Sequence, residues 1–249
     1  MRRQSITDSA GNAWVGCSGW AYPSWRGEFY PPGTSPKKLL EAYAAKLNSV
    51  EVNYTFRSLP TRSAVEGWLA QTGPEFRFSF KAPQRITHLQ RLQDCGAAMD
   101  ALLEALEPVK TAGRMGAILF QLPPSMKIAT ERLAQFLEEI RDLNLRTAFE
   151  FRHPSWFDPR IYRVLEKFGA ALCIAESDDL VTPEIETASF AYYRLRKSEY
   201  STARLAEIAS MLKTKAAQGD VFAYFKHEEA PTGALRAAAV LRDVQGRPA

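Results

Sequence analysis

Eight short runs rich in apolar residues recur along the chain, and stretches with helical periodicity lie between most of them. The runs predicted as strands cover residues 13–18, 49–53, 76–81, 116–122, 147–152, 170–175, 190–195 and 221–226. Strands that alternate with helices build parallel βαβ units. Eight such units favour an α/β fold closed into a (β/α)8 TIM-like barrel over an open doubly wound sheet, which has the same local pattern.

The helical stretches have recognisable ends. Asp158-Pro159 opens one helix with an N-cap and a proline, and Gly169 ends it. Thr232 is predicted to cap the last helix. The segment 177–188 is too polar and too short for a full helix, so we expect a degenerate crossover there. The length of 249 residues suits one barrel, and 1–249 is predicted to be a single domain.

Composition sets few limits on location or partners. The net charge is +4, and no block of like charges stands out, so an anionic partner is permitted without being required. Cys17 and Cys173 lie in apolar runs that predict buried free thiols. No apolar segment follows the N-terminal residues, and none reaches the roughly 18 residues of a membrane span. We therefore expect a cytoplasmic protein that does not bind membranes.

Alternation within the strands predicts which side chains enter the barrel. One set of alternate residues packs against helices and must be apolar, while the other set faces the interior. Val50 and Val52 therefore point outward, and their neighbours Glu51 and Asn53 point inward. The same rule turns inward the polar residues Arg77, Ser79, Lys81, Gln121, Glu150, Arg152, Arg194, Arg196, Tyr224 and Lys226. Arg77 lies deeper than the others, and we expect it to pair with Glu51.

The inward side chains near the carboxyl ends of the strands are charged, and this end is where barrel enzymes bind ligands. The carboxylates are Glu51 and Glu150, and the cations are Lys81, Arg152, Arg194, Arg196 and Lys226. Excess positive charge in a concave site calls for an anion to balance it, so we expect a small anionic ligand at this mouth. The alternative is that the charges pair only with one another and hold the barrel together.

Segments that follow the strands add further candidate contacts. All three histidines come after predicted strands, namely His88, His153 and His227. Ser18 and Trp20 lie at the end of the first strand, where Trp20 is placed to stack on a flat ligand group. The chain has no H-E-x-x-H motif and no compact His/Asp cluster, so no metal site is predicted, and the sequence identifies no cofactor.

Several motifs occur in a fixed order over nearly the whole chain. They include Gly16-Cys17-Ser18-Gly19-Trp20, Glu51-Val52-Asn53, Gln121-Leu122-Pro123-Pro124-Ser125, Glu150-Phe151-Arg152-His153 and Tyr193-Arg194-Leu195. Together they resemble the domain-of-unknown-function 72 family. The resemblance implies a TIM-barrel-like fold and brings no established reaction. Arg57, Arg196-Lys197 and Lys226-His227-Glu228 depart from the residues usual in that family, and all three lie near the predicted mouth.

Three functions fit these observations. The first is an enzyme that acts on a small anionic substrate, such as a phosphorylated sugar or a nucleotide, by general acid/base chemistry. Glu51 or Glu150 would transfer the proton, a histidine such as His153 would assist, and the cations would bind the anion. The second is nucleic-acid binding or processing, which the net charge and the aromatic residues favour. The third is a ligand-binding module without catalysis. The sequence does not indicate the oligomeric state.

Overall fold

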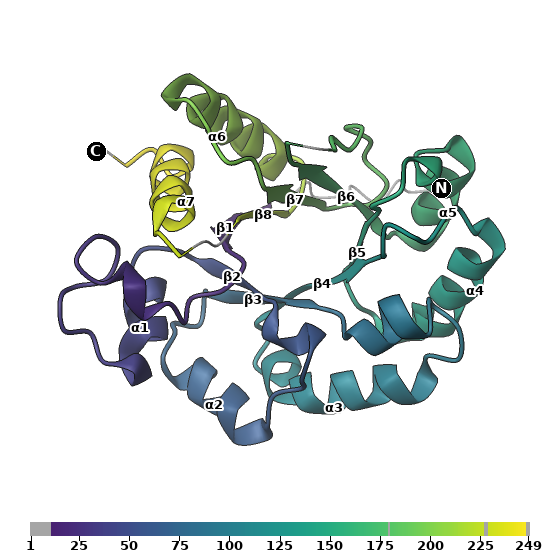
Figure 1. Cartoon of the computed structure of the whole chain (residues 1–249), viewed down its shortest axis with the longest axis horizontal. Coiled ribbons are helices and arrows are strands. Elements are labelled where there is room, and N and C mark those ends of the chain that lie inside the picture. Colours follow the sequence, from purple (N-terminus) through teal and green to yellow (C-terminus); the bar gives the residue numbers. More distant parts are fainter. Residues whose placement is uncertain (1–10, 179, 227–228, 248–249) are drawn as a thin grey trace, which may run out of the picture.

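The structure, a computed structural model, describes residues 11–178, 180–226 and 229–247. Its strands close into one parallel barrel in the order of the sequence, from β1 to β8 and back to β1 (Figure 1). The strands are β1 (Ala13–Cys17), β2 (Ser49–Val52), β3 (Arg77–Lys81), β4 (Met115–Gln121), β5 (Thr147–Glu150), β6 (Ala171–Glu176), β7 (Ala191–Leu195) and β8 (Val221–Phe225). The predicted (β/α)8 barrel is confirmed.

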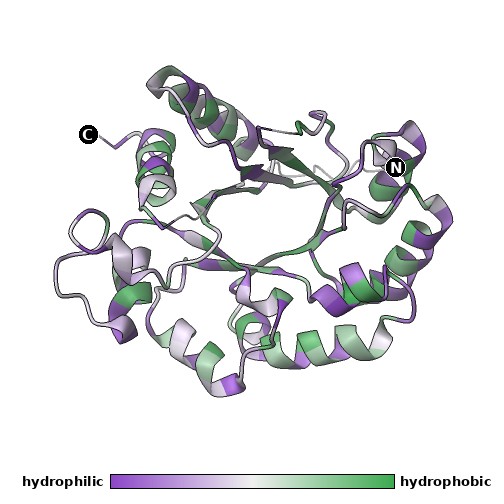
Figure 2. Ribbon diagram, in the orientation of Figure 1, coloured by the Kyte–Doolittle hydropathy of each residue, from purple (hydrophilic) through white to green (hydrophobic). Residues whose placement is uncertain are grey.

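The helices form a layer around the barrel (Figure 1). They are α1 (Leu39–Ala44), α2 (Arg62–Ala70), α3 (Gly96–Thr111), α4 (Thr130–Ile140), α5 (Pro159–Phe168), α6 (Thr202–Ala216) and α7 (Thr232–Val244). Hydrophobic and hydrophilic residues are mixed along each of them, as amphipathic packing requires (Figure 2). Among the described residues, no helix is long and apolar enough to cross a membrane.

The crossover from β6 to β7 contains no helix in its described residues, as predicted from its polar sequence. Thr187 attaches this segment to the barrel, because its Oγ1 donates to Ala170 O at 2.7 Å and accepts from Leu172 N at 2.8 Å. The two bonds satisfy backbone groups at the start of β6.

Local signals predict one helix start correctly and another incorrectly. Asp158 caps α5 by accepting from Arg160 N at 2.8 Å, and Gly169 ends the helix with a φ of +63°. Thr232 is not a cap: it is the first residue of α7, and the preceding proline takes the cap position. A Cβ at Gly233 would lie 2.0 Å from Lys226 O, so this glycine lets the helix begin in close contact with the end of β8.

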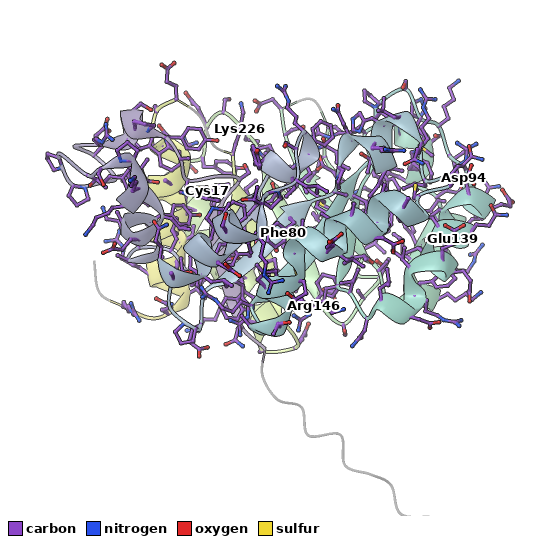
Figure 3. All side chains as sticks on the ribbon, turned by 90° about the horizontal axis from the view of Figure 1, so that it is seen from below. Cys17, Phe80, Asp94, Glu139, Arg146 and Lys226 are labelled. Atoms are coloured by element: carbon purple, nitrogen blue, oxygen red, sulfur yellow. The ribbon has the colours of Figure 1, made fainter. Side chains whose placement is uncertain are left out.

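The barrel interior is apolar at its amino end. Its buried residues there and in the middle are mostly small or aromatic, namely Trp14, Ala117, Leu119, Ala148, Ala171, Cys173, Phe190, Tyr192, Phe222 and Tyr224. A second, larger cluster lies between the strands and the helices. Figure 3 shows the two ends of the barrel in side view, with Lys226 near the upper rim and Arg146 near the lower one. Because aromatic side chains fill the lower part, the interior is open to a ligand from the carboxyl end.

Arg77 does not pair with Glu51, so that expectation is wrong. Arg77 begins β3 and lies beside Ser49, whereas Glu51 lies beside Ser79 farther along the strand. The Arg77 guanidinium instead lies over the Trp14 ring at 4.7 Å and donates to the Pro74 carbonyl at 3.0 Å. The alternation of residues along a strand predicts whether a side chain points into the barrel. How deep it lies in the barrel depends on where the strand begins.

Candidate functional site

A pocket of about 670 Å³ opens at the carboxyl ends of the strands. We call it the mouth pocket. It brings together eight of the residues selected from the sequence, namely Asn53, Lys81, His88, Gln121, Arg152, Arg194, Arg196 and Lys226. The remaining lining residues are Leu122, Pro124, Ser177, Asp178 and Leu180. Its size is within the range of small-molecule sites.

Two buried carboxylates and one buried arginine form the floor below this pocket. Arg194 donates from Nε and Nη2 to the two oxygens of Glu51, at 3.0 and 2.7 Å. Its remaining Nη1 donates to Glu150 Oε2 at 2.6 Å. Glu51 and Glu150 are fully buried, and Arg194 is 3% exposed. We call these three residues the ionic floor.

Further groups surround each carboxylate of the ionic floor. Arg196 Nη2 lies 3.2 Å from Glu51 Oε1, and the hydroxyl of Tyr192 donates to Glu51 Oε2 at 2.8 Å. Arg152 Nη2 lies 2.5 Å from Glu150 Oε1, in an ion pair whose geometry is not that of a hydrogen bond. Both carboxylates are therefore balanced by cations rather than left as exposed bases.

These contacts keep the carboxylates ionised. Burial raises the pKa of Glu150, but Arg194, Arg152 and Arg196 outweigh burial and lower it to about 2. For Glu51, Arg194 and Arg196 likewise outweigh the effect of burial, so its pKa lies below its ordinary value. A buried carboxylate with so low a pKa is a poor proton acceptor at neutral pH. The geometry thus favours an anchoring role over the acid/base role expected from the sequence.

Lys81 projects from the end of β3 into the mouth pocket. Its Nζ donates to Gln121 Oε1 at 2.8 Å and lies 4.1 Å from the centre of the Phe56 ring. Gln121 in turn donates from Nε2 to Glu150 Oε2 at 2.8 Å, which fixes its amide orientation because a carboxylate only accepts. Burial and the charge of Arg194 lower the pKa of Lys81 to about 8.

The three histidines have different positions. His88 lines the mouth pocket on the short π-helical segment Arg85–Leu89. Burial and the nearby Lys81 lower its pKa. His153 does not line the pocket, because its Nδ1 accepts from Ser155 N at 3.1 Å and caps the turn that follows β5. His227 lies outside the described residues.

Cations outnumber carboxylates around the mouth pocket. The described side chains there comprise five cations and three carboxylates, since Asp178 joins the two glutamates. The guanidinium group of Arg196 makes one hydrogen bond to a described residue, through Nη2, and its Nε has no partner there. Arg152 Nε is also without a partner among the described residues. The two guanidinium groups therefore keep donor capacity that internal acceptors do not use.

Ser18 and Trp20 line a neighbouring pocket of about 440 Å³ rather than the mouth pocket. Asn53 lines both. Tyr192 was not predicted as a site residue, although it lies two residues before Arg194 on β7 and therefore faces inward with it. Phe56 and Asp178 were also not predicted, because Phe56 lies in a 3-10 turn and Asp178 in a loop, where strand alternation gives no direction. Among the described residues, no group of three or more His, Cys, Asp or Glu side chains is arranged to hold a metal ion.

Comparison with known proteins gives a family match over most of the chain. The profile of the family described as "Protein of unknown function DUF72" matches residues 14–248. The UPF0759 protein YunF of Bacillus subtilis is 30% identical over 163 residues, which cover 64% of this chain and 57% of that protein. The UPF0759 protein YecE of Escherichia coli K12 is 32% identical over 145 residues, covering 58% and 50%. The chain thus matches about half the length of these curated relatives.

Solved structures share the fold at lower sequence identity. A DUF72 family protein from Thermotoga maritima superposes with a TM-score of 0.82 at 24% identity, covering 94% of this chain and 99% of that one. A DUF72 family protein from Enterococcus faecalis gives a TM-score of 0.76 at 18% identity, covering 96% and 97%. These similarities concern the barrel itself.

Proposed function

Since the chain belongs to the DUF72 family, whose description names no activity, we propose a function from its mouth pocket: the protein is an enzyme that binds a small anionic substrate there and acts on it by general acid/base chemistry. The substrate class is a phosphorylated or otherwise strongly anionic metabolite. Lys81 is the group that transfers the proton.

The excess of cations around the mouth pocket supports the proposal most directly. Arg152 and Arg196 keep guanidinium donors that no described acceptor uses. Desolvated positive charges held close together repel one another, and a bound anion relieves that repulsion. Guanidinium groups also bind phosphate and carboxylate oxygens in a bidentate manner.

The ionic floor gives these cations their positions. Glu51 and Glu150 hold Arg194 between them and hold Arg196 and Arg152 at the two sides. The carboxylates thus act through the arginines, and not on the substrate. A rigid set of donors that is assembled before the substrate arrives needs little reorganisation when negative charge develops in a reaction.

Lys81 reaches the mouth pocket and has a pKa suited to proton transfer near neutral pH. With a pKa of about 8, its amine exists in both protonation states near neutral pH. The Gln121 amide holds its Nζ at 2.8 Å, and Glu150 holds that amide in turn. A bound anion favours the ammonium form, so Lys81 would act as the proton donor to the bound substrate.

The binding step can be tested with inorganic phosphate by titration calorimetry at pH 8, in two buffers with different ionisation enthalpies. We expect saturable binding with uptake of part of a proton, because the anion raises the pKa of Lys81. The Lys81→Met variant should lose the proton uptake. Lys213→Met, which removes an exposed lysine from α6, is the matched control and should behave as the wild type does. Absence of phosphate binding at low ionic strength would contradict the anion site.

The catalytic step can be tested on a panel of phosphorylated sugars and nucleotides. We expect turnover of at least one compound, a loss of about 10²–10⁴-fold in Lys81→Met, and no loss in Lys213→Met. For a proton donor, kcat/KM should fall as the pH rises above about 8. Binding without turnover of any compound in the panel would make the protein a ligand-binding module and reject the enzymatic part of the proposal.

A further inference from the structure

A second pocket of about 440 Å³ lies beside the mouth pocket, between the loop after β1, the end of β2 and α2. We call it the aromatic pocket. Its lining residues are Ser18, Gly19, Trp20, Ala21, Tyr22, Val52, Asn53, Tyr54, Leu59, Pro60, Thr61, Ala64 and Trp68. None of these described residues is charged, whereas the mouth pocket is lined by five cations. The two neighbouring pockets therefore suit different chemical groups.

The walls of the aromatic pocket are held in place by the core. Trp20 packs edge to face against Trp68, with ring centres 5.4 Å apart at 82°. Trp68 is stacked in turn on the fully buried Phe78 at 6.4 Å. Gly19 has a φ of +129°, and a Cβ there would lie 2.8 Å from the hydroxyl of Tyr22. The loop thus depends on this glycine to bring Tyr22 and Trp20 around the pocket.

Asn53 joins the two pockets. It follows β2 directly and lines both of them. Its Nδ2 donates to Ser18 O at 3.3 Å on the side of the aromatic pocket, while its buried Oδ1 has no partner among the described residues. Buried polar atoms normally have a partner, so an unused acceptor at this junction indicates where a ligand donor would bind.

We infer that the substrate carries a flat aromatic ring in the aromatic pocket and its anionic group in the mouth pocket, so that it is an aryl or nucleotide-like phosphate ester. The inference rests on the proposed function. Indole and phenol rings line the aromatic pocket, and Tyr54 at its edge is 57% exposed. Exposed aromatic rings beside a cationic groove stack on flat rings while the cations hold the phosphate.

The test is a titration series on the full chain. Inorganic phosphate is compared with phenyl, benzyl and phenethyl phosphate, which hold the ring at increasing distances from the anion. The best ester should bind about tenfold more tightly than phosphate, the gain expected from one stacked ring. Cyclohexyl phosphate, which has a ring of similar size that is not flat, should show a smaller gain.

Two variants locate that gain. Trp20→Ala should remove the advantage of the best ester and leave phosphate affinity unchanged. Ala64→Phe, which places a larger side chain in the same pocket from α2, should do the same and decides the case if Trp20→Ala does not fold. Tyr162→Ala removes an aromatic residue of α5 that lines neither pocket, and should change nothing.

The possible results separate the two proposals. If phosphate binds but no ester binds more tightly, the aromatic subsite is rejected and the anion site stands. If the gain survives in both Trp20→Ala and Ala64→Phe, the ring binds elsewhere and the subsite is also rejected. If neither phosphate nor any ester binds, the proposed function fails and this inference fails with it.

Discussion

At both ends of the barrel interior, alternate residues of the strands point inward, but these side chains are apolar at the amino end and charged at the carboxyl end. Near the amino end, Trp14 and Phe222 fill the space between the strands, and their rings stack with centres 6.5 Å apart. Toward the carboxyl end, the ionic floor takes the place of such packing. An apolar layer would stabilise the barrel without the cost of removing charges from water. The difference indicates that the upper layer serves binding, whereas the lower layer serves the fold.

The largest effect should come from breaking the ionic floor at its centre. Arg194→Met leaves Glu51 and Glu150 buried without the cation that joins them, which should lower the free energy of unfolding by about 3–5 kcal/mol at pH 7. The loss should shrink at lower pH, because both carboxylates protonate more readily without Arg194. Urea unfolding at pH 7 and pH 5 measures both effects.

A matched variant gives the comparison for Arg194→Met. Arg160→Met removes an arginine that is 61% exposed and paired with Asp158, and should cost much less than Arg194→Met because water already solvates both charges. Equal losses in the two variants would mean that the ionic floor has no special place in the stability of the barrel.

Acid should destabilise the mouth before it affects the apolar layer. The pKa of Glu150 is about 2 in the folded protein against an ordinary value of 4.5, so its contribution is present above about pH 4.5 and is lost as the pH falls toward 2. That contribution is on the order of 3 kcal/mol. In Glu150→Gln, the free energy of unfolding should depend less steeply on pH over this range. The difference in slope should correspond to about one fewer proton taken up on unfolding. An unchanged slope would contradict the low pKa.

Two inward-facing tyrosines allow the charged and uncharged parts of the interior to be compared through single hydroxyl groups. Tyr192 donates to the carboxylate of Glu51, while Tyr224 bonds with the hydroxyls of Ser49 and Ser79 at 2.6 and 2.8 Å. Tyr192→Phe should cost about 2 kcal/mol, because its acceptor is charged, and Tyr224→Phe about 1 kcal/mol. The first loss should decrease only as the pH falls through the lowered pKa of Glu51, and the second should not. Denaturant unfolding of both variants over a series from pH 7 down to pH 2 would show the contrast, and the same pH response in both would contradict it.

Most of the fold could be predicted from local sequence. Each strand begins and ends within two residues of the predicted positions, because a buried strand must be apolar on its outer face and polar residues follow at its end. The missing helix after β6 was visible in the polar segment 177–188. The start of α7 could not be predicted from local sequence, since it depends on the contact between Gly233 and the end of β8.

The direction of the site residues was predictable, but their partners were not. Alternation turned Glu51 and Arg194 inward, yet they come from β2 and β7, which are not neighbours in the barrel. Which side chains meet across the interior depends on the stagger of all eight strands, and no local pattern reports it. The pKa of Lys81 likewise depends on Arg194, which is distant in the sequence. The sequence therefore indicated a charged mouth, but not which of its charges are buried as anchors.

Among the arginines of the mouth pocket, the one nearest to solvent should have the smallest effect on stability, and its effect on binding should be the more informative one. Arg152 is 35% exposed and touches Glu150 through one nitrogen, while Arg194 and Gln121 continue to hold that carboxylate. Arg152→Ala should therefore cost about 1 kcal/mol or less in the free energy of unfolding. Loss of one charge-assisted hydrogen bond should weaken phosphate binding about tenfold. Calorimetric titration and urea unfolding of the same sample measure the two quantities. A large loss of stability with unchanged phosphate affinity would place Arg152 with the ionic floor, and Arg196 would then be the arginine left to bind the anion.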